Sequence, residues 1–136
     1  MAIELSNLTF TEEDDIVPAS GEEEIINTGS ANTLAGNDQI TGIGSDYGFK
    51  NLGVLNTDDG EDIIYGNGLG RTSNVGIYNT GTLNAGEGND LITGLGLFTF
   101  NPYCDGIYNS GTLKAGEGND TITASANQGG IYNIGT

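Results

Sequence analysis

Residues 76–94 read GIYNTGTLNAGEGNDLITG, and residues 106–124 read GIYNSGTLKAGEGNDTITA. The two segments match nearly residue for residue, without gaps. Residues 48–66 (GFKNLGVLNTDDGEDIIYG) and 24–42 (EIINTGSANTLAGNDQITG) are more distant copies, and residues 130–136 (GIYNIGT) begin a further one. Self-similarity at a period of about 20 to 50 residues is the sequence signature of repeat architectures, in which each copy buries its apolar face against its neighbours.

The copies begin 24, 28, 30 and 24 residues apart, while the repeated unit keeps 19 residues. Variation in length therefore falls in the connecting loops, as the stacking of equal coils on one axis requires. We predict an all-β fold, a parallel β-helix (β-solenoid) of about five coils with 24–30 residues per coil. The expected single domain, 1–136, divides into an acidic cap or degenerate coil at 1–23, coils at 24–47, 48–75, 76–105 and 106–129, and a truncated coil at 130–136.

Alternation of apolar and polar residues predicts three short strands per coil, at 77–79, 82–85 and 91–93 in the third copy. Stacking places equivalent residues above one another, about 4.8 Å apart. A two-sheet sandwich is the competing fold, but it would not require the same side chains to recur at the same place in every copy. The expected core columns are Ile25, Phe49, Ile77, Ile107 and Ile131; Ile40, Ile64, Ile92 and Ile122; and Leu55, Leu83 and Leu113.

Three polar or aromatic columns accompany the apolar ones. Stacked side-chain amides can hydrogen-bond to one another, so we expect an asparagine ladder of Asn27, Asn51, Asn79, Asn109 and Asn133. The glycine two residues after each of these asparagines is assigned to a turn with positive φ. Tyr78, Tyr108 and Tyr132 are expected to project outward and to stack on one another.

The composition restricts the function. Lys and Arg total 3 against 19 Asp and Glu, which gives a formal charge of −16 and argues against nucleic acid and anionic membranes as partners. The natural partner is a cation. The chain has no histidine and one cysteine, Cys104, which excludes disulfide frameworks, Cys/His zinc sites and histidine-based triads. No stretch is apolar enough for membrane insertion, and we expect no enzymatic activity.

The segments AGEGNDLIT (85–93) and AGEGNDTIT (115–123) resemble the glycine- and aspartate-containing nonapeptide of the RTX, or hemolysin-type, calcium-binding repeats. Copies at 24–42 and 48–66 keep the second glycine and the aspartate but have Leu34 and Asp58 at the first glycine. One such turn per coil is more similar to RTX adhesin solenoids than to the usual tandem nonapeptides. The resemblance implies Ca²⁺ held by Asp38, Asp62, Asp90 and Asp120, with carbonyl oxygens from Gly36, Gly60, Gly86, Gly88, Gly116 and Gly118.

A physical argument leads to the same ion. Aspartates stacked at β-sheet spacing repel one another by roughly 3 to 4 kcal/mol per neighbouring pair at an effective dielectric constant near 20. Ca²⁺ accepts six to eight oxygens in flexible loops and would offset this repulsion, whereas Mg²⁺ demands strict octahedral geometry. The alternative is that these aspartates face solvent or cap turn amides, as Asp commonly does beside glycine. Glu87 and Glu117, between the glycines, are expected to face water.

The sequence therefore predicts a calcium-binding structural or adhesive repeat domain, a stiff spacer or surface module of a secreted protein. The resemblance places it outside the cell or on the cell surface. One alternative is an ion-independent, self-associating β-solenoid, with end-to-end contact through the open coil that ends at Thr136. Two less favoured alternatives are a glycan-binding or glycan-processing β-helix and an ice-binding surface, whose threonine column would be interrupted by Tyr65. The apolar insertion at 95–104 is expected to form a flap.

Overall fold

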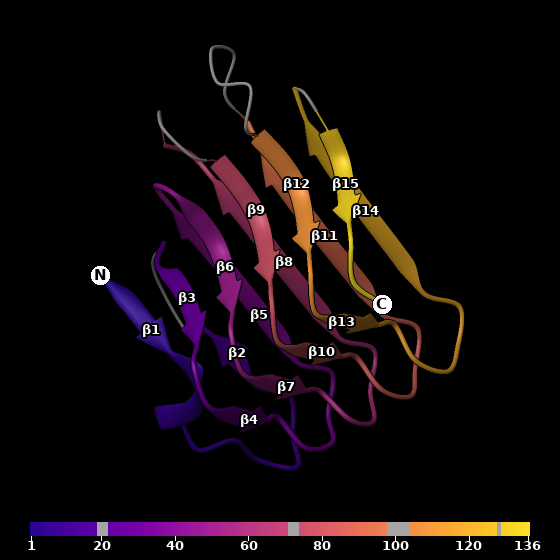
Figure 1. Cartoon of the computed structure of the whole chain (residues 1–136). Coiled ribbons are helices and arrows are strands. Elements are labelled where there is room, and N and C mark those ends of the chain that lie inside the picture. Colours follow the sequence, from indigo (N-terminus) through magenta and orange to yellow (C-terminus); the bar gives the residue numbers. More distant parts are fainter. Residues whose placement is uncertain (19–21, 71–73, 98–103, 128) are drawn as a thin grey trace.

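The computed structural model describes residues 1–18, 22–70, 74–97, 104–127 and 129–136, and these form a parallel β-solenoid. Within this described part the chain contains strands, turns and one short 3₁₀ helix, and no α-helix. Each complete coil consists of three strands, one from each of three parallel sheets (Figure 1). The prediction of an all-β, parallel β-helix is confirmed.

The first sheet has the strand order β1-β3-β6-β9-β12-β15 and forms the front face in Figure 1. Its strands are β1 (Ala2–Glu4), β3 (Glu24–Asn27), β6 (Tyr47–Asn51), β9 (Asn74–Asn79), β12 (Cys104–Asn109) and β15 (Gly129–Asn133). The second sheet has the order β13-β10-β7-β4 and contains β4 (Ser30–Asn32), β7 (Val54–Asn56), β10 (Thr82–Asn84) and β13 (Thr112–Lys114). The third sheet, β14-β11-β8-β5-β2, contains β2 (Ile16–Val17), β5 (Gln39–Gly44), β8 (Ile63–Gly68), β11 (Leu91–Gly96) and β14 (Thr121–Ala126).

The register aligns equivalent residues of the copies. Phe49 lies beside Ile25 and Ile77, Ile92 lies beside Ile64 and Ile122, and Leu83 lies beside Leu55 and Leu113, so the predicted alignment of the apolar columns is confirmed. Ile122 and Ile131, predicted as core residues, are exposed because no further coil of the described chain covers them. Their inward side chains form one narrow core in which Phe49, Leu55, Ile64, Ile77, Leu83 and Ile107 are fully buried. A thin core of this kind is stabilised by contacts between successive coils.

The leading segment packs on the first repeat. β1 pairs with β3, and β2 pairs with β5 so that Ile16 and Val17 align with Gln39 and Ile40. Between them the 3₁₀ helix η1 (Leu5–Asn7) carries Leu5, which is fully buried. At the opposite end the side chains of Ile122, Ile131 and Ile134 are exposed. The two ends of the described solenoid therefore differ: the leading end is covered, and the other presents apolar side chains.

Two details differ from the sequence predictions. The strands of the third sheet are longer than expected, since β11 continues from Leu91 to Gly96. The glycines after the asparagine column do not have positive φ. They are required by close approach instead, because a Cβ on Gly53 would collide with the carbonyl oxygen of Gly29, and one on Gly81 with that of Gly53. Tight stacking of the corner, rather than an unusual backbone conformation, explains these glycines.

Candidate functional site

The candidate site is the turn that joins the second sheet to the third in every coil. Both glycine positions of the motif require left-handed backbone: φ is 105° at Gly86 and 143° at Gly88. The copies without the first glycine adopt the same conformation, with φ of 71° at Leu34 and 59° at Asp58. Since left-handed backbone disfavours residues with a Cβ, the shared geometry shows that stacking on neighbouring coils overrides local preference.

The aspartates that follow these glycines form a continuous file along the solenoid axis. The Asp62 carboxylate accepts a hydrogen bond from the backbone N–H of Asp38 through Oδ1 (2.8 Å), and Asp90 accepts in the same way from Asp62 (2.9 Å). Asp120 Oδ1 accepts in turn from the N–H of Asp90 (3.0 Å). At the other end of the file, Asp38 Oδ1 accepts from the N–H of Asp15 in the leading segment (2.8 Å). The structure therefore brings all four predicted aspartates together and adds Asp15.

These carboxylates lie inside the turn and away from solvent. Asp38 and Asp62 are 1% exposed and Asp90 is 2% exposed, whereas Asp120 near the open end is half-buried. The second oxygen, Oδ2, is buried without a hydrogen-bond partner in Asp38, Asp62 and Asp90. A buried carboxylate oxygen without a partner is costly, because the ionised group loses its hydration and gains nothing in return.

The pKa values reflect this uncompensated burial. Burial raises the pKa of Asp62 to about 6 from its ordinary 3.8, and the charges of Asp38 and Asp90 add to the rise. The nearby Thr57 hydroxyl and the N–H of Asp38, which donates to Oδ1, oppose this rise. Burial likewise raises the pKa of Asp38 and of Asp90. The raised pKa values indicate that no nearby positive charge compensates the buried carboxylates.

Thr33 and Thr57 line the interior of the turn beside these aspartates, and both are fully buried. The Thr57 hydroxyl lies at the Asp62 carboxyl but has one proton to give, and the 2.7 Å distance to the carbonyl oxygen of Ala85 assigns it there. Asp62 Oδ2 is accordingly left without a donor. In the next coil Ala85 occupies this position and offers no hydroxyl. These threonines were not predicted as site residues, because in the sequence they look like ordinary strand-end residues.

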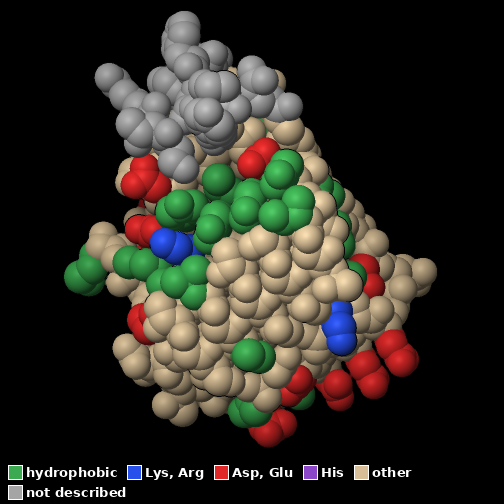
Figure 2. Space-filling model, in the orientation of Figure 1, with side chains coloured by type: hydrophobic (Ala, Val, Ile, Leu, Met, Phe, Trp, Pro, Cys, Tyr) green, Lys and Arg blue, Asp and Glu red, His purple; other side chains and the backbone are tan. Residues whose placement is uncertain are grey.

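A second row of side chains caps the same turns from outside. Asn37 accepts from the N–H of Glu61 (2.8 Å), and Asn89 accepts from the N–H of Asn119 (3.0 Å). Farther out, Asp59, Glu87 and Glu117 are exposed and aligned by bridges between successive coils, so the prediction that Glu87 and Glu117 face water is confirmed. Figure 2 shows acidic side chains in a row at the lower right, where these turns lie.

The oxygen atoms available at this turn are of the chemical type that calcium prefers. Ca²⁺ accepts carboxylate and backbone carbonyl oxygens together, and the file offers one spare carboxylate oxygen at each of three coils beside glycine-rich backbone. Within the described ranges, no three acidic, cysteine or histidine side chains converge on one point. Backbone carbonyls and water would therefore have to supply most of the ligands, as they do in calcium loops built with few acids.

The asparagine ladder is a separate structural element on the corner after the first sheet. Asn51 donates through Nδ2 to Asn79 Oδ1 (2.7 Å) and to the carbonyl oxygen of Thr82 (2.9 Å). The same pair of bonds repeats from Asn27 to Asn109, and Asn133 accepts the last amide bond from Asn109 (2.8 Å). Asn27 Oδ1 is buried without a partner at the leading end. The predicted asparagine ladder is confirmed.

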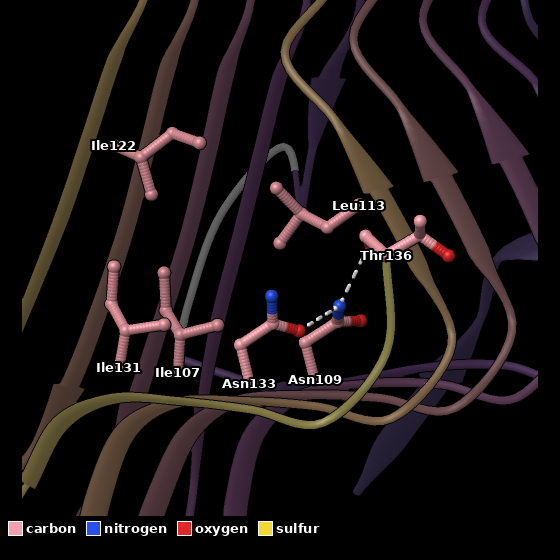
Figure 3. A pocket seen from close by; sticks show the side chains of 7 residues that line it. All are labelled: Ile107, Asn109, Leu113, Ile122, Ile131, Asn133 and Thr136. Atoms are coloured by element: carbon pink, nitrogen blue, oxygen red, sulfur yellow. Dashed lines mark hydrogen bonds between the residues drawn. The ribbon is translucent and has the colours of Figure 1, made fainter.

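The open end of the core forms an apolar pocket of about 210 Å³, lined by Ile107, Asn109, Leu113, Ile122, Ile131, Asn133 and Thr136. Figure 3 shows Ile107 and Ile131 side by side and Asn109 bonded to both Asn133 and Thr136. The pocket is thus the end of the coil stack and holds no titratable group among these residues. The apolar insertion expected as a flap falls largely on 98–103, outside the described residues.

Comparison with protein-family models, with curated proteins and with solved structures finds no match for this chain. Among the described residues, no helix has the length and hydropathy needed to cross a membrane.

Proposed function

We propose that this chain is a calcium-binding structural repeat domain, which serves as a stiff spacer or adhesive surface module of a secreted protein. The observation that carries the proposal is the file of Asp38, Asp62 and Asp90, each almost fully buried with one carboxylate oxygen unpaired. Five aspartates in register, counting the half-buried Asp15 and Asp120, accumulate negative charge, and at the three buried members water screens it little. A divalent cation would neutralise that charge.

The residues that would hold the ion are Asp38, Asp62, Asp90 and Asp120, with carbonyl oxygens of Gly36, Gly60, Gly86, Gly88, Gly116 and Gly118. When bound, Ca²⁺ would supply positive charge and would tie successive turns together. The turn's own contribution is to hold one carboxylate per coil at a fixed height through the Oδ1 hydrogen bond. Because stability in a solenoid depends on contacts between coils, such an ion would stiffen the whole stack.

Calorimetric titration of Ca²⁺ into chelated protein, with circular dichroism melting before and after, tests the proposal. We expect heat of binding at sub-millimolar to millimolar Ca²⁺, a rise in Tm that is reversed by chelation, and a smaller effect of Mg²⁺. The double variant Asp62→Asn and Asp90→Asn should lose most of the rise. The matched control Asp59→Asn removes an exposed acid from the same turn and should keep it. Absence of any shift at millimolar Ca²⁺ would refute calcium binding.

A second candidate function, ion-independent self-association, is favoured by the open end. Ile131 is 54% exposed and Ile134 is 64% exposed, and β14 and β15 are the last strands of their sheets there. Unprotected edges pair readily with other chains. Sedimentation in the presence of chelator tests it: concentration-dependent oligomers that are abolished by Ile131→Lys would support end-to-end contact, and a monomer at all concentrations would rule it out.

The glycan alternative receives no support from the tyrosine column. Tyr78 and Tyr108 stack with their planes 8° apart, so their ring faces contact each other. A sugar-stacking platform instead needs exposed aromatic faces. In the ice-binding alternative, Tyr65 lies between Thr41 and Thr93 and breaks the threonine column as the sequence indicated.

A further inference from the structure

The outer face of the first sheet carries a column of tyrosines. Tyr78 and Tyr108 have ring centroids 4.9 Å apart, and Tyr108 and Tyr132 have centroids 5.4 Å apart with planes inclined by 15°. The strands that bear them are neighbours in register, so each ring lies directly above its equivalent one coil away. Tyr47 joins at the other end in a tilted contact with Tyr78, at 5.0 Å and 55°. In Figure 2 hydrophobic side chains form a band across this front sheet.

The column is reachable from solvent. Tyr132 is 49% exposed, and Tyr78 and Tyr108 are half-buried, which leaves part of each ring open to small reagents. Tyr78 is nevertheless desolvated enough that burial raises its pKa, an effect to which Tyr108 and Tyr47 add. Stacked phenols that are held together on hydrogen-bonded strands meet at a high effective concentration, which favours any reaction between them.

We propose that the column Tyr78, Tyr108 and Tyr132 is a site of oxidative cross-linking, in which a one-electron phenol oxidant of the peroxidase class, with hydrogen peroxide, joins tyrosines of adjacent coils. Each of two phenols gives up one electron and one proton, and the two tyrosyl radicals form a carbon–carbon bond between ring positions ortho to the hydroxyls. The hydrogens on those carbons move to the oxygens and restore both aromatic rings. Hydrogen peroxide takes up the two electrons and two protons and leaves as two waters.

The surroundings of the tyrosine column favour coupling at the end that contains Tyr108 and Tyr132. Lys50 Nζ lies 4.8 Å from the centroid of Tyr47 and 5.9 Å from that of Tyr78. A cation over a ring stabilises the intact phenol and disfavours removal of an electron from it. Together with the tilt of Tyr47 on Tyr78, this directs coupling toward Tyr108 and Tyr132. The resulting bond would clamp β12 to β15 and so fasten the last coil, independently of calcium.

Treatment of the purified chain with peroxidase and hydrogen peroxide, followed by dityrosine fluorescence and peptide mass spectrometry, tests the proposal. We expect intrachain Tyr108–Tyr132 and Tyr78–Tyr108 peptides and a yield per chain that is unchanged over about a tenfold range of protein concentration, because the reaction is intramolecular. Tyr108→Phe removes a partner from both stacked pairs and should abolish most of the intrachain signal. Tyr132→Phe should leave only the Tyr78–Tyr108 peptide.

Tyr65→Phe is the matched control, since Tyr65 is half-buried on the third sheet between two threonines, and this change should leave the yield intact. Circular dichroism of each variant shows whether the fold is retained, which is expected because phenylalanine can keep the ring stack. Cross-links found only between chains, or a yield insensitive to Tyr108→Phe in the folded variant, would overturn the proposal.

Discussion

Lowering the pH of the calcium-free protein from about 7 to about 5 should raise its free energy of unfolding, contrary to ordinary acid denaturation. The pKa of Asp62 is raised from 3.8 to about 6 in the folded chain, so between these values the folded state binds more protons than the unfolded one. Stability then increases as the pH falls through 6 and the gain is complete below 3.8. At about 1.36 kcal/mol per pKa unit, the rise from 3.8 to about 6 corresponds to about 3 kcal/mol once both states are protonated. Between about pH 7 and about pH 5 the gain is about 1.3 kcal/mol of this. The raised pKa values of Asp38 and Asp90 act in the same direction.

Calcium should reverse this dependence. The ion binds ionised carboxylates, so acidification through pH 6 removes the form that holds it and lowers the apparent affinity. At saturating Ca²⁺ we therefore expect stability that is highest near neutral pH and falls toward acid. Urea unfolding followed by circular dichroism, with chelator and with millimolar Ca²⁺ at each pH, gives both curves. Midpoints should be compared only where the slope m is unchanged, since a change in m signals altered compactness.

The variant Asp62→Asn measures how the buried charge of Asp62 affects stability. The amide keeps an oxygen for the N–H of Asp38 and can place Nδ2 toward the Thr57 hydroxyl, so without calcium at neutral pH it should be more stable than the parent chain. Asp59→Asn makes the same change in net charge on an exposed side chain and measures the contribution of general repulsion at a charge of −16. A calcium-free Asp62→Asn protein that is less stable than the parent at neutral pH would refute the view that this carboxylate is an uncompensated charge.

Four further substitutions test the rest of the structure by the same unfolding measurement. Asn79→Ala removes a buried amide that donates to Asn109 and Thr112 and accepts from Asn51, and it should cost about 3 kcal/mol or more, whereas Asn133→Ala at the exposed end should cost about 1 kcal/mol or less. Equal costs would contradict the view that burial and the number of hydrogen bonds set the contribution of each asparagine. Gly88→Ala should cost about 3 kcal/mol or more, because φ is 143° there and its Cβ would collide with the carbonyl oxygen of Gly60. A fully stable Gly88→Ala protein would contradict the turn geometry. Leu34→Gly should stabilise by up to about 1 kcal/mol, because it relieves left-handed backbone at φ 71°, and a clear loss would mean that the Leu34 side chain contributes more than the strain costs.

Repetition in the sequence is enough to predict the stacking of coils, the apolar columns and the asparagine ladder. In a parallel solenoid one register relates every copy, so the alignment of Asn51 with Asn79 is also the alignment of Phe49 with Ile77. Positions that depend on a single contact between coils could not be predicted in this way. The corner glycines looked like positive-φ residues, yet their reason is the carbonyl oxygen one coil away. Leu34 and Asp58 replace the first glycine of the motif and so looked unable to form the same turn, yet they adopt the left-handed conformation.

The sequence also could not decide between an ion site and simple capping, because both use the same aspartates. The structure shows that capping occupies only Oδ1: Asp62 accepts the N–H of Asp38, and its Oδ2 has no partner. A sequence gives the residue type at each column, but it does not show which side-chain atom has no hydrogen-bond partner. That second oxygen is what distinguishes an amide cap from a group that still requires a proton or a cation.

A comparison of two columns within this chain favours the cation. At the corner after the first sheet, a column that bonds along the axis and is buried from Asn27 to Asn109 is asparagine in every copy and carries no charge. At the next corner, a column that is also buried and also bonds along the axis is aspartate, although asparagine could accept the same N–H without the cost of a buried charge. Capping therefore explains the side-chain length and the Oδ1 contact at Asp38, Asp62 and Asp90, but not their charge. A bound cation explains both, and it accounts for aspartate in a position where a neutral amide would suffice for the fold alone.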